Sequence, residues 1–184
     1  YRNADGIFGQ SEEIIRHVNQ FPSTKNKFVY RNLQQYAVAA QPKRKHTPFR
    51  IVYAGLLGVA QDIYSTIENI PFQSIGAEFH LYGGGNQTEK IKEYINKHPG
   101  CFVYYHGYVK KKQIAEELSR YDASIVPLTV AIKGAVPSKI YDLIPIGIPI
   151  LFCGGGEGAE IVSKYYFGMV SKPHDFKQLH NNII

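Results

Sequence analysis

The segment from Gly134 to Phe152 contains one carboxylate, Asp142, among residues that direct the backbone. Pro137 favours an extended conformation at the residue before it, and Ser138 is of a type that caps helices, so a helix is predicted to begin at Lys139. A proline and a glycine then end this helix and return the chain to a strand. Asp142 is thus predicted to lie about one turn into the helix. There it could accept hydrogen bonds from a pair of ligand hydroxyls, or it could only complement the helix dipole.

Glycine-rich turns follow most of the predicted strands, and such turns could bind phosphate. Glycine lets backbone N–H groups approach an anion closely, and a helix that begins after the turn adds a favourable dipole. The turns therefore indicate a phosphorylated ligand, first of all a nucleotide. The fingerprint G-x-G-x-x-G does not follow the first strand, which argues against NAD, and the P-loop pattern is also absent. The turns comprise residues 55–58, 83–87, 106–109, 129–138 and 154–158.

From Arg50 onward, apolar β-type runs alternate with runs in which apolar residues have helical spacing. Runs such as IVYAGLL and SIVPL are almost continuously apolar, which is typical of strands buried on both faces. The pattern predicts an α/β fold, a Rossmann-like, doubly wound parallel sheet of about six strands with helices on both faces. Ligands of such sheets bind beyond the carboxyl ends of the strands. We expect strands at 50–57, 78–85, 101–107, 123–128, 148–156 and 168–172, and helices at 60–70, 88–98, 111–121, 138–144, 158–166 and 174–183.

Residues 1–35 do not join this alternation. They predict one strand and one helix, followed by an extended connector at 27–33. Residues 41–48 are polar with two prolines and are interpreted as a linker. The polar, acidic start is typical of the middle of a chain, so we expect a fragment of a longer protein.

Composition limits the alternatives only in part. The 184 residues carry a formal net charge of +6, and a basic surface can attract nucleic acid, anionic lipid or a phosphorylated ligand. The densest basic run, Lys110 to Lys112, is predicted to be the exposed first turn of a helix. Cys101 and Cys153 lie in apolar runs and are expected to be buried free thiols, which favours a reducing compartment. No apolar run is long enough to span a bilayer.

Five motifs follow one another along the chain: YAGLLG, LYGGG, YHGYV, PSKIYDLIPIGIP and GEGAEIV. In type and order they resemble motifs of the nucleotide-binding half of retaining glycosyltransferases with the two-domain GT-B fold, often called family 4 or glycosyl transferases group 1. The resemblance covers nearly the whole chain. It implies that residues 1–35 are the tail of an N-terminal domain with the interdomain connector, and that residues 36–184 are the C-terminal, nucleotide-sugar-binding domain. The last two of these motifs, PSKIYDLIPIGIP and GEGAEIV, are the most specific in their order and spacing.

The resemblance also implies a donor site. In such enzymes a carboxylate at the position of Asp142, usually Glu, holds both ribose hydroxyls of the nucleotide sugar. The family's second carboxylate falls on Gly134, and the basic pair that often follows the first strand is replaced, with Lys139, Lys133 and Gln61 as candidate substitutes. The predicted donor-binding residues are Gly55, Gly58, Gly83, Gly84, Gly107, Tyr108, Val109, Gly134, Ala135, Val136, Pro137, Ser138, Lys139 and Asp142.

By this resemblance the protein would be a retaining hexosyltransferase that passes sugar from a UDP-sugar to a carbohydrate or lipid-linked acceptor in surface polysaccharide synthesis. It would need no metal or other cofactor, because helix dipoles and backbone N–H groups would stabilise the leaving diphosphate. Acceptor and catalytic contacts would come mainly from an N-terminal domain, so this fragment is expected to be inactive alone. We expect a cytoplasmic location, with peripheral contact to the inner face of the membrane as a further option.

Two alternatives remain open. One is a non-catalytic, nucleotide-binding regulatory module. The other, nucleic-acid binding, depends on net charge alone and lacks a recognisable motif, so no nucleic-acid partner is expected. The histidines show no convincing triad or metal spacing, and His106, at the end of a strand, is interpreted as structural.

Overall fold

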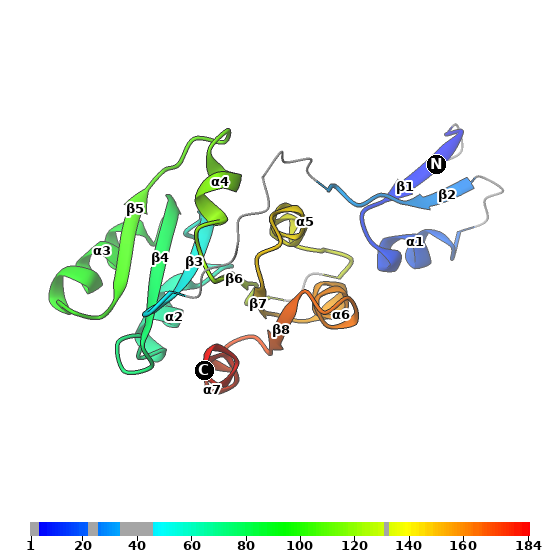
Figure 1. Cartoon of the computed structure of the whole chain (residues 1–184). Helices are drawn as coiled ribbons and strands as arrows, with labels where there is room; N and C mark the ends of the chain where they lie inside the picture. Colours follow the sequence, from blue (N-terminus) through cyan, green and yellow to red (C-terminus); the bar gives the residue numbers. More distant parts are fainter. Residues whose placement is uncertain (1–3, 22–25, 34–45, 131–132) are drawn as a thin grey trace.

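The computed structural model describes residues 4–21, 26–33, 46–130 and 133–184. At its centre is a six-stranded sheet in which each strand runs parallel to its neighbours (Figure 1). The order β5-β4-β3-β6-β7-β8 confirms the predicted doubly wound fold. The order reverses between β3 and β6, the usual place of a ligand crevice in such sheets. The strands are β3 (Phe49–Leu56), β4 (Ala77–Gly84), β5 (Val103–Gly107), β6 (Ala123–Pro127), β7 (Ile150–Cys153) and β8 (Gly168–Ser171).

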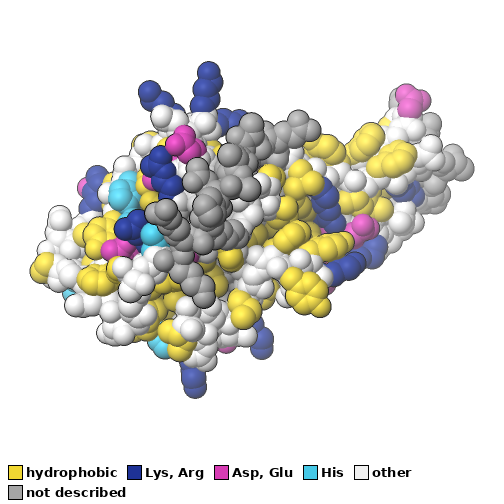
Figure 2. Space-filling model, in the orientation of Figure 1, with side chains coloured by type: hydrophobic (Ala, Val, Ile, Leu, Met, Phe, Trp, Pro, Cys, Tyr) yellow, Lys and Arg dark blue, Asp and Glu magenta, His cyan; other side chains and the backbone are white. Residues whose placement is uncertain are grey.

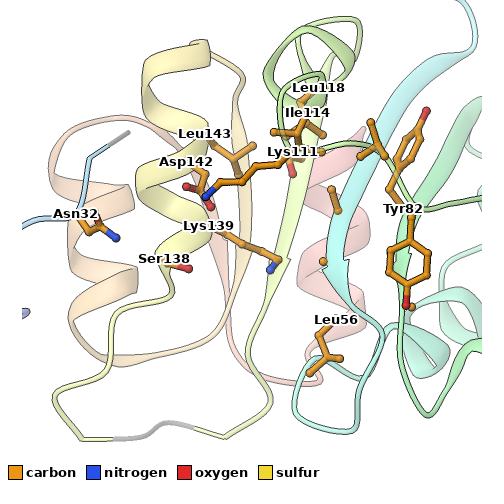
Figure 3. Close-up of a pocket in the computed structure, with 17 residues that line it drawn as sticks. Asn32, Leu56, Tyr82, Lys111, Ile114, Leu118, Ser138, Lys139, Asp142 and Leu143 are labelled. Carbon is orange, nitrogen blue, oxygen red and sulfur yellow. The ribbon is translucent and has the colours of Figure 1, made fainter. Parts of the chain in front are cut away.

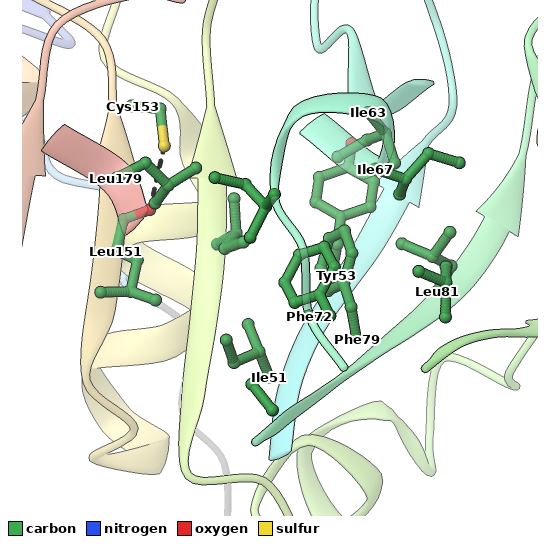
Figure 4. Close-up of a cluster of buried hydrophobic side chains, with 14 of the residues drawn as sticks. Ile51, Tyr53, Ile63, Ile67, Phe72, Phe79, Leu81, Leu151, Cys153 and Leu179 are labelled. Atoms are coloured by element: carbon green, nitrogen blue, oxygen red, sulfur yellow. Dashed lines mark hydrogen bonds between the residues drawn. The ribbon is translucent and has the colours of Figure 1, made fainter. Parts of the chain in front are cut away.

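Two apolar cores cover the two faces of this sheet, as predicted. Since successive side chains of a strand point to opposite faces, Ile51 and Tyr53 of β3 belong to one core and Val52 to the other. Helices α2, α3 and α7 pack on the first core, where the rings of Phe72 and Phe79 are stacked (Figure 4). Helices α4, α5 and α6 pack on the second. The helices are α2 (Ile63–Asn69), α3 (Thr88–Lys97), α4 (Ile114–Leu118), α5 (Ser138–Leu143), α6 (Gly156–Lys164) and α7 (Phe176–Ile183).

Helix α5 begins at Ser138, the first residue of the predicted range 138–144 but one residue before the start expected with Ser138 as the cap. The Ser138 side chain makes no capping hydrogen bond, so the predicted cap is wrong. Pro137 occupies the cap position instead, and its ring presets the backbone for entry into the helix. The helix continues into a short 3-10 turn (Ile144–Ile146), which Gly147 closes in a left-handed conformation as predicted.

Helix α3 begins at Thr88, as predicted, whereas the start of α4 differs from prediction. The helix expected from Lys111 begins three residues later, at Ile114. The preceding lysines are exposed, as expected, but they belong to the loop between β5 and α4.

The N-terminal residues form a small unit of their own. Strand β1 (Gly6–Gly9), helix α1 (Glu12–Val18) and strand β2 (Asn26–Val29) confirm the predicted strand and helix, whereas the predicted connector begins as a strand that pairs in parallel with β1. The unit lies beside α5 and α6 (Figure 1, right). The expected domain boundary and most of the expected linker fall within residues 34–45, outside the described residues.

Two further expectations concern cysteines and membranes. Both thiols are free, with Cys153 buried and Cys101 partly buried. Within the described ranges, no helix has the length and apolar character that crossing a membrane requires.

Candidate functional site

A cavity of about 630 Å³ opens at the carboxyl ends of β3 and β4 and extends between α4 and α5 (Figure 3). Its walls include the ends of these two strands, the loop after β5, and helices α4 and α5. These parts meet because the parallel sheet brings the ends of neighbouring strands to one edge. A volume of this size is within the range of sites for cofactors and small ligands.

Glycines form one wall of the cavity. Gly55 and Gly83 pair across β3 and β4, and both have positive φ angles, 156° and 115°. A side chain at Gly83 would collide with the carbonyl group of Gly55, and one at Gly55 would collide with the end of Lys139. At Gly84 the obstacle would be the hydroxyl of Tyr108. This wall is therefore backbone, and a ligand can approach it closely.

Lys139 extends from α5 across the cavity toward this wall (Figure 3). Its ammonium lies 5.5 Å from the centre of the Tyr53 ring, a cation–π distance. Burial lowers the pKa of the Lys139 ammonium, and the Asp142 carboxylate offsets part of that effect. Among the described residues, no carboxylate lies within 4 Å of this ammonium and no group accepts a hydrogen bond from it.

Asp142 lies one helical turn further along α5 and is half-buried. Burial raises the pKa of its carboxyl group, while Lys139 and Lys111 both act to lower it. The Lys111 side chain reaches over from the loop before α4 and points toward Asp142 (Figure 3). No described residue donates a hydrogen bond to this carboxylate. Its acceptor capacity is therefore open to a ligand, whose hydroxyls could bond to both oxygens.

The structure brings eight of the fourteen predicted site residues to the cavity. They are Gly55, Gly83, Gly84, Tyr108, Val109, Ser138, Lys139 and Asp142. The other six do not line it. They are Gly58, Gly107, Gly134, Ala135, Val136 and Pro137.

Gly134 shows why part of the predicted segment lies elsewhere. Its N–H donates a hydrogen bond to the Glu13 carboxylate of α1, and the side chain of Ile14 packs against it. The residue thus faces the N-terminal unit. Lys133 and Gln61, two of the three candidates for the missing basic pair, also lie outside the cavity lining, and only Lys139 of the three is part of it.

Sequence reasoning missed several lining residues. Tyr82 directly precedes the glycine run of β4, and Lys111 lies in the basic run. Both residues could therefore have been found from the patterns that adjoin them. Asn32 reaches the cavity from the N-terminal connector, for which no local pattern exists. The missed polar and apolar residues include Asn32, Leu56, Tyr82, Lys111, Ile114 and Ser124.

His106 lies outside the cavity lining and has the structural surroundings that were expected. Its ring stacks on Tyr82, and its Nε2 lies 2.9 Å from Nδ1 of His80. Burial lowers the pKa of both imidazoles. Among the described residues, no group of three or more His, Cys, Asp or Glu side chains could hold a metal ion.

Comparisons with known proteins agree with this architecture. Three solved structures align with nearly all of the chain. TarM of S. aureus is 20% identical, and the alignment covers 99% of this chain and 36% of TarM with a TM-score of 0.73. The lipopolysaccharide outer core galactosyltransferase WaaB is 18% identical, with 98% of this chain and 52% of WaaB covered and a TM-score of 0.72. Alr3699/HepE of Anabaena is 15% identical, with 99% of this chain and 53% of that chain covered and a TM-score of 0.71. The chain thus spans about a third to a half of their lengths. At this identity they show the fold alone, that of the Rossmann-like domains of GT-B enzymes.

A search of curated proteins found no match. The family model described as "Glycosyl transferases group 1" matches residues 48–184, which is the whole six-stranded domain. The chain therefore belongs to the glycosyl transferases group 1 family.

Proposed function

We propose that the chain is the nucleotide-sugar-binding, C-terminal domain of a retaining GT-B glycosyltransferase, and that its cavity binds a UDP-sugar. One observation carries the proposal: a half-buried carboxylate, Asp142, lies in the same cavity as a largely buried ammonium and a backbone wall of glycines. A nucleoside diphosphate has the matching groups, since its ribose diol donates hydrogen bonds and its phosphates accept them.

The solved relatives support UDP as the nucleotide. TarM was solved with UDP and α-GlcNAc-glycerol, and HepE with UDP and glucose. WaaB is named for sugar transfer in the lipopolysaccharide outer core. We accordingly propose a carbohydrate or lipid-linked acceptor in surface polysaccharide synthesis, with acceptor and catalytic contacts supplied by a preceding domain.

The described residues suggest how the donor would be held and activated. Backbone N–H groups beside Gly55 and Gly83, together with Lys139, would stabilise the negative charge that develops on the leaving diphosphate. This would require no metal. Tyr108, at the mouth of the cavity, would contact the base. The exposed Lys110 and Lys112 would face an anionic membrane in a cytoplasmic enzyme.

Calorimetry with UDP and 2′-deoxy-UDP tests the role of Asp142. A carboxylate that accepts from both ribose hydroxyls contributes a charge-assisted pair, so Asp142→Ala should weaken UDP binding about tenfold to a hundredfold. The native protein should bind the deoxy ligand more weakly than UDP, whereas the Ala variant should bind both alike. Asp142→Glu, which keeps the carboxylate, should retain binding.

Equal affinity of the native protein for UDP and its 2′-deoxy analogue would reduce Asp142 to a helix-dipole residue. The absence of UDP binding would remove the proposal as a whole. A regulatory module remains the alternative if UDP binds but the full-length protein, supplied with UDP-sugar and acceptor extracts, releases no UDP.

A further inference from the structure

Four stacked aromatic rings on strands β4 and β5 adjoin the cavity. The His80 ring stacks on Tyr104 and on His106, with ring centroids 5.0 and 5.2 Å apart. The His106 ring in turn stacks on Tyr82, with the centroids 4.7 Å apart. His80 and Tyr82 are two residues apart in β4, so their side chains lie on the same face of the sheet. Tyr82 itself lines the cavity (Figure 3), and the two histidines therefore lie next to the cavity wall.

The two imidazoles share a hydrogen bond whose direction follows from their neighbours. Nδ1 of His80 lies 2.9 Å from Nε2 of His106, and Nε2 of His80 lies 3.2 Å from the Glu78 carboxylate. An ionised carboxylate only accepts, so Nε2 of His80 donates to Glu78. In neutral His80 the acceptor is then Nδ1, and Nε2 of His106 donates to it. The bonds thus run from His106 through His80 to Glu78.

This direction gives the two possible protonations different effects. A proton added to His106 binds at Nδ1, away from the shared bond, which persists and becomes charge-assisted. A proton added to His80 binds at Nδ1, the atom that accepts the bond. With both rings protonated, two positively charged N–H donors face each other, and the bond is lost. The histidine pair therefore keeps its bond with one added proton but not with two.

Charged groups on three elements determine when the second proton binds. Burial lowers the pKa of His80, Glu78 of β4 acts against burial, and His106 and Arg50 of β3 act with it. Burial also lowers the pKa of His106, and Glu117 of α4 acts against it. Both values therefore lie below about 6.5, the ordinary value for histidine, and the second proton binds only in acid. The neighbouring tyrosines have raised pKa values and stay neutral there; they are Tyr82, Tyr104 and Tyr121.

Tyr82 is held between α4 and the histidine pair. Its hydroxyl donates to Glu117 at 2.7 Å and lies 2.8 Å from the hydroxyl of Tyr121. Glu117 is fixed in turn by an ion pair with Arg120. The ring of Tyr82 is covered by His106. A displacement of His106 would therefore remove one of the contacts that fix this lining residue.

The chain enters the cavity wall directly after His106. Gly107 has a positive φ of 72°, and the next two residues, Tyr108 and Val109, line the cavity. The pairing between β4 and β5 is irregular at this point, since its register shifts at Tyr82, which pairs with Gly107. The bond between the imidazoles thus joins β5 to β4 where the backbone pairing is interrupted.

We propose that His106 is a positioning residue of the cavity: its bond to His80 holds the wall formed by residues 107–109 in place until both imidazoles are protonated. The cavity wall should consequently loosen in acid, in a step that belongs to the histidine pair. The inference adds a control to the site of the proposed function, and it rests on that function only where UDP serves as the probe.

NMR titration of the whole chain without ligand tests the inference. In native protein the two imidazoles should titrate in separate steps, and most of the shift of the Val109 methyl signals should accompany the second step. His106→Phe keeps a ring that can stack on Tyr82 but can neither titrate nor bond to His80, so this shift should disappear. His98→Phe, at an exposed histidine that stacks on a tyrosine of α3, is the matched control and should respond as native protein does.

A second variant changes the position of the step without touching the stacked rings. Glu78→Gln removes the charge that favours a protonated His80, so the second step should move to lower pH. The methyl signals of Ile51, in the core on the other face of the sheet, should not move with that step. A Val109 shift that accompanies the first step, persists in His106→Phe or coincides with movement of Ile51 would contradict the inference. Should His106→Phe not fold, an unchanged second step in Glu78→Gln would contradict it equally.

Calorimetry with UDP separates the inference from the proposed function. Since a UDP phosphate also titrates at a pH of about 6, native protein is compared with His106→Phe at each pH. UDP affinity should fall more steeply in native protein as pH passes through the second step. Parallel curves would show that the function stands and the inference is wrong. If UDP does not bind at any pH, the proposed function fails, and the Val109 titration still decides the inference.

Discussion

The described residues form two parallel sheets that are stabilised in different ways. The six-stranded sheet is covered by helices on both faces, and Phe79 within it has no exposed surface. The two-stranded sheet of β1 and β2 leaves the stacked rings of Phe8 and Phe28 70% and 49% exposed. Hydrophobic side chains accordingly lie on the surface of the N-terminal unit (Figure 2, right). Since two strands alone are marginally stable, this unit depends on its neighbours.

Several polar contacts between the two parts involve Glu157 of α6. This buried carboxylate accepts hydrogen bonds from the backbone N–H groups of Glu12 and Glu13, at 3.0 and 3.1 Å, and forms an ion pair with Arg31. It therefore serves the first turn of α1, whose orphan N–H groups need an acceptor. The large sheet is stabilised by apolar burial on both faces, whereas Glu157 is a main point of attachment for the N-terminal unit. This difference can be tested.

The largest expected effect is on the free energy of unfolding, and it distinguishes Phe79 of the large sheet from Phe8 of the small one. Phe79→Ala empties a fully buried position and should lower the free energy of unfolding by about 3–5 kcal/mol. Phe8→Ala removes an exposed ring and should change the free energy of unfolding by no more than about 0.5 kcal/mol. Urea unfolding followed by circular dichroism measures both. Comparable losses in the two variants would show that the small sheet shares the cooperative core.

A second expected effect concerns the attachment of the N-terminal unit. Glu157→Gln removes the charge and one acceptor oxygen, so bonds worth about 1–3 kcal/mol should be lost. Hydrogen exchange at the Glu12 and Glu13 amides should accelerate about tenfold or more, while exchange in β4 stays unchanged. Glu160→Gln, an exposed carboxylate on the same helix, is the matched control. Faster exchange throughout the large sheet would contradict a local role.

The same carboxylate predicts a pH effect. Burial acts to raise the pKa of Glu157, but the N–H groups of Glu12 and Glu13 and the Arg31 guanidinium hold it below its usual value. A lowered carboxyl pKa stabilises the folded unit above the unfolded pKa, about 4.3, and this stabilisation is lost as pH falls through the folded pKa. NMR signals of the buried Ile7 and Val18 should therefore broaden or shift on acidification. In Glu157→Gln this pH dependence should disappear.

The smallest expected effect lies at the cavity. Burial raises the pKa of Asp142, so the folded state disfavours its ionised form, and its contribution to stability improves as pH falls through the folded pKa. Asp142→Asn should thus slightly raise the melting temperature at neutral pH while weakening UDP binding. Asp5→Asn, at an exposed position, should change neither. A lower melting temperature for Asp142→Asn would identify the carboxylate as structural.

The large sheet could be predicted from sequence because each of its elements carries its own signal. Strand β6 is mostly apolar because both its faces are buried, and α3 shows helical spacing of apolar residues. Of the residues that line the cavity, sequence could predict only those near the glycine-rich ends of strands and those of α5. Gly134 lies outside the cavity lining, and local sequence cannot show that Glu13, 121 residues away, accepts a hydrogen bond from its N–H. Asn32 could not be predicted for the same reason.

The side chain of Arg31 joins the connector to the site helix. Nη1 of Arg31 donates to the carbonyl of Gln10 at 2.9 Å and to the hydroxyl of Tyr141 at 3.1 Å, while Nη2 pairs with Glu157. Tyr141 lies between Lys139 and Asp142 in the sequence of α5. The connector therefore cannot slide relative to α5 without breaking a bond to the residue that separates the two ligand-facing charges. Displacement of the N-terminal unit is mechanically linked to the spacing and tilt of those charges, although the cavity lies on another side of the same helix.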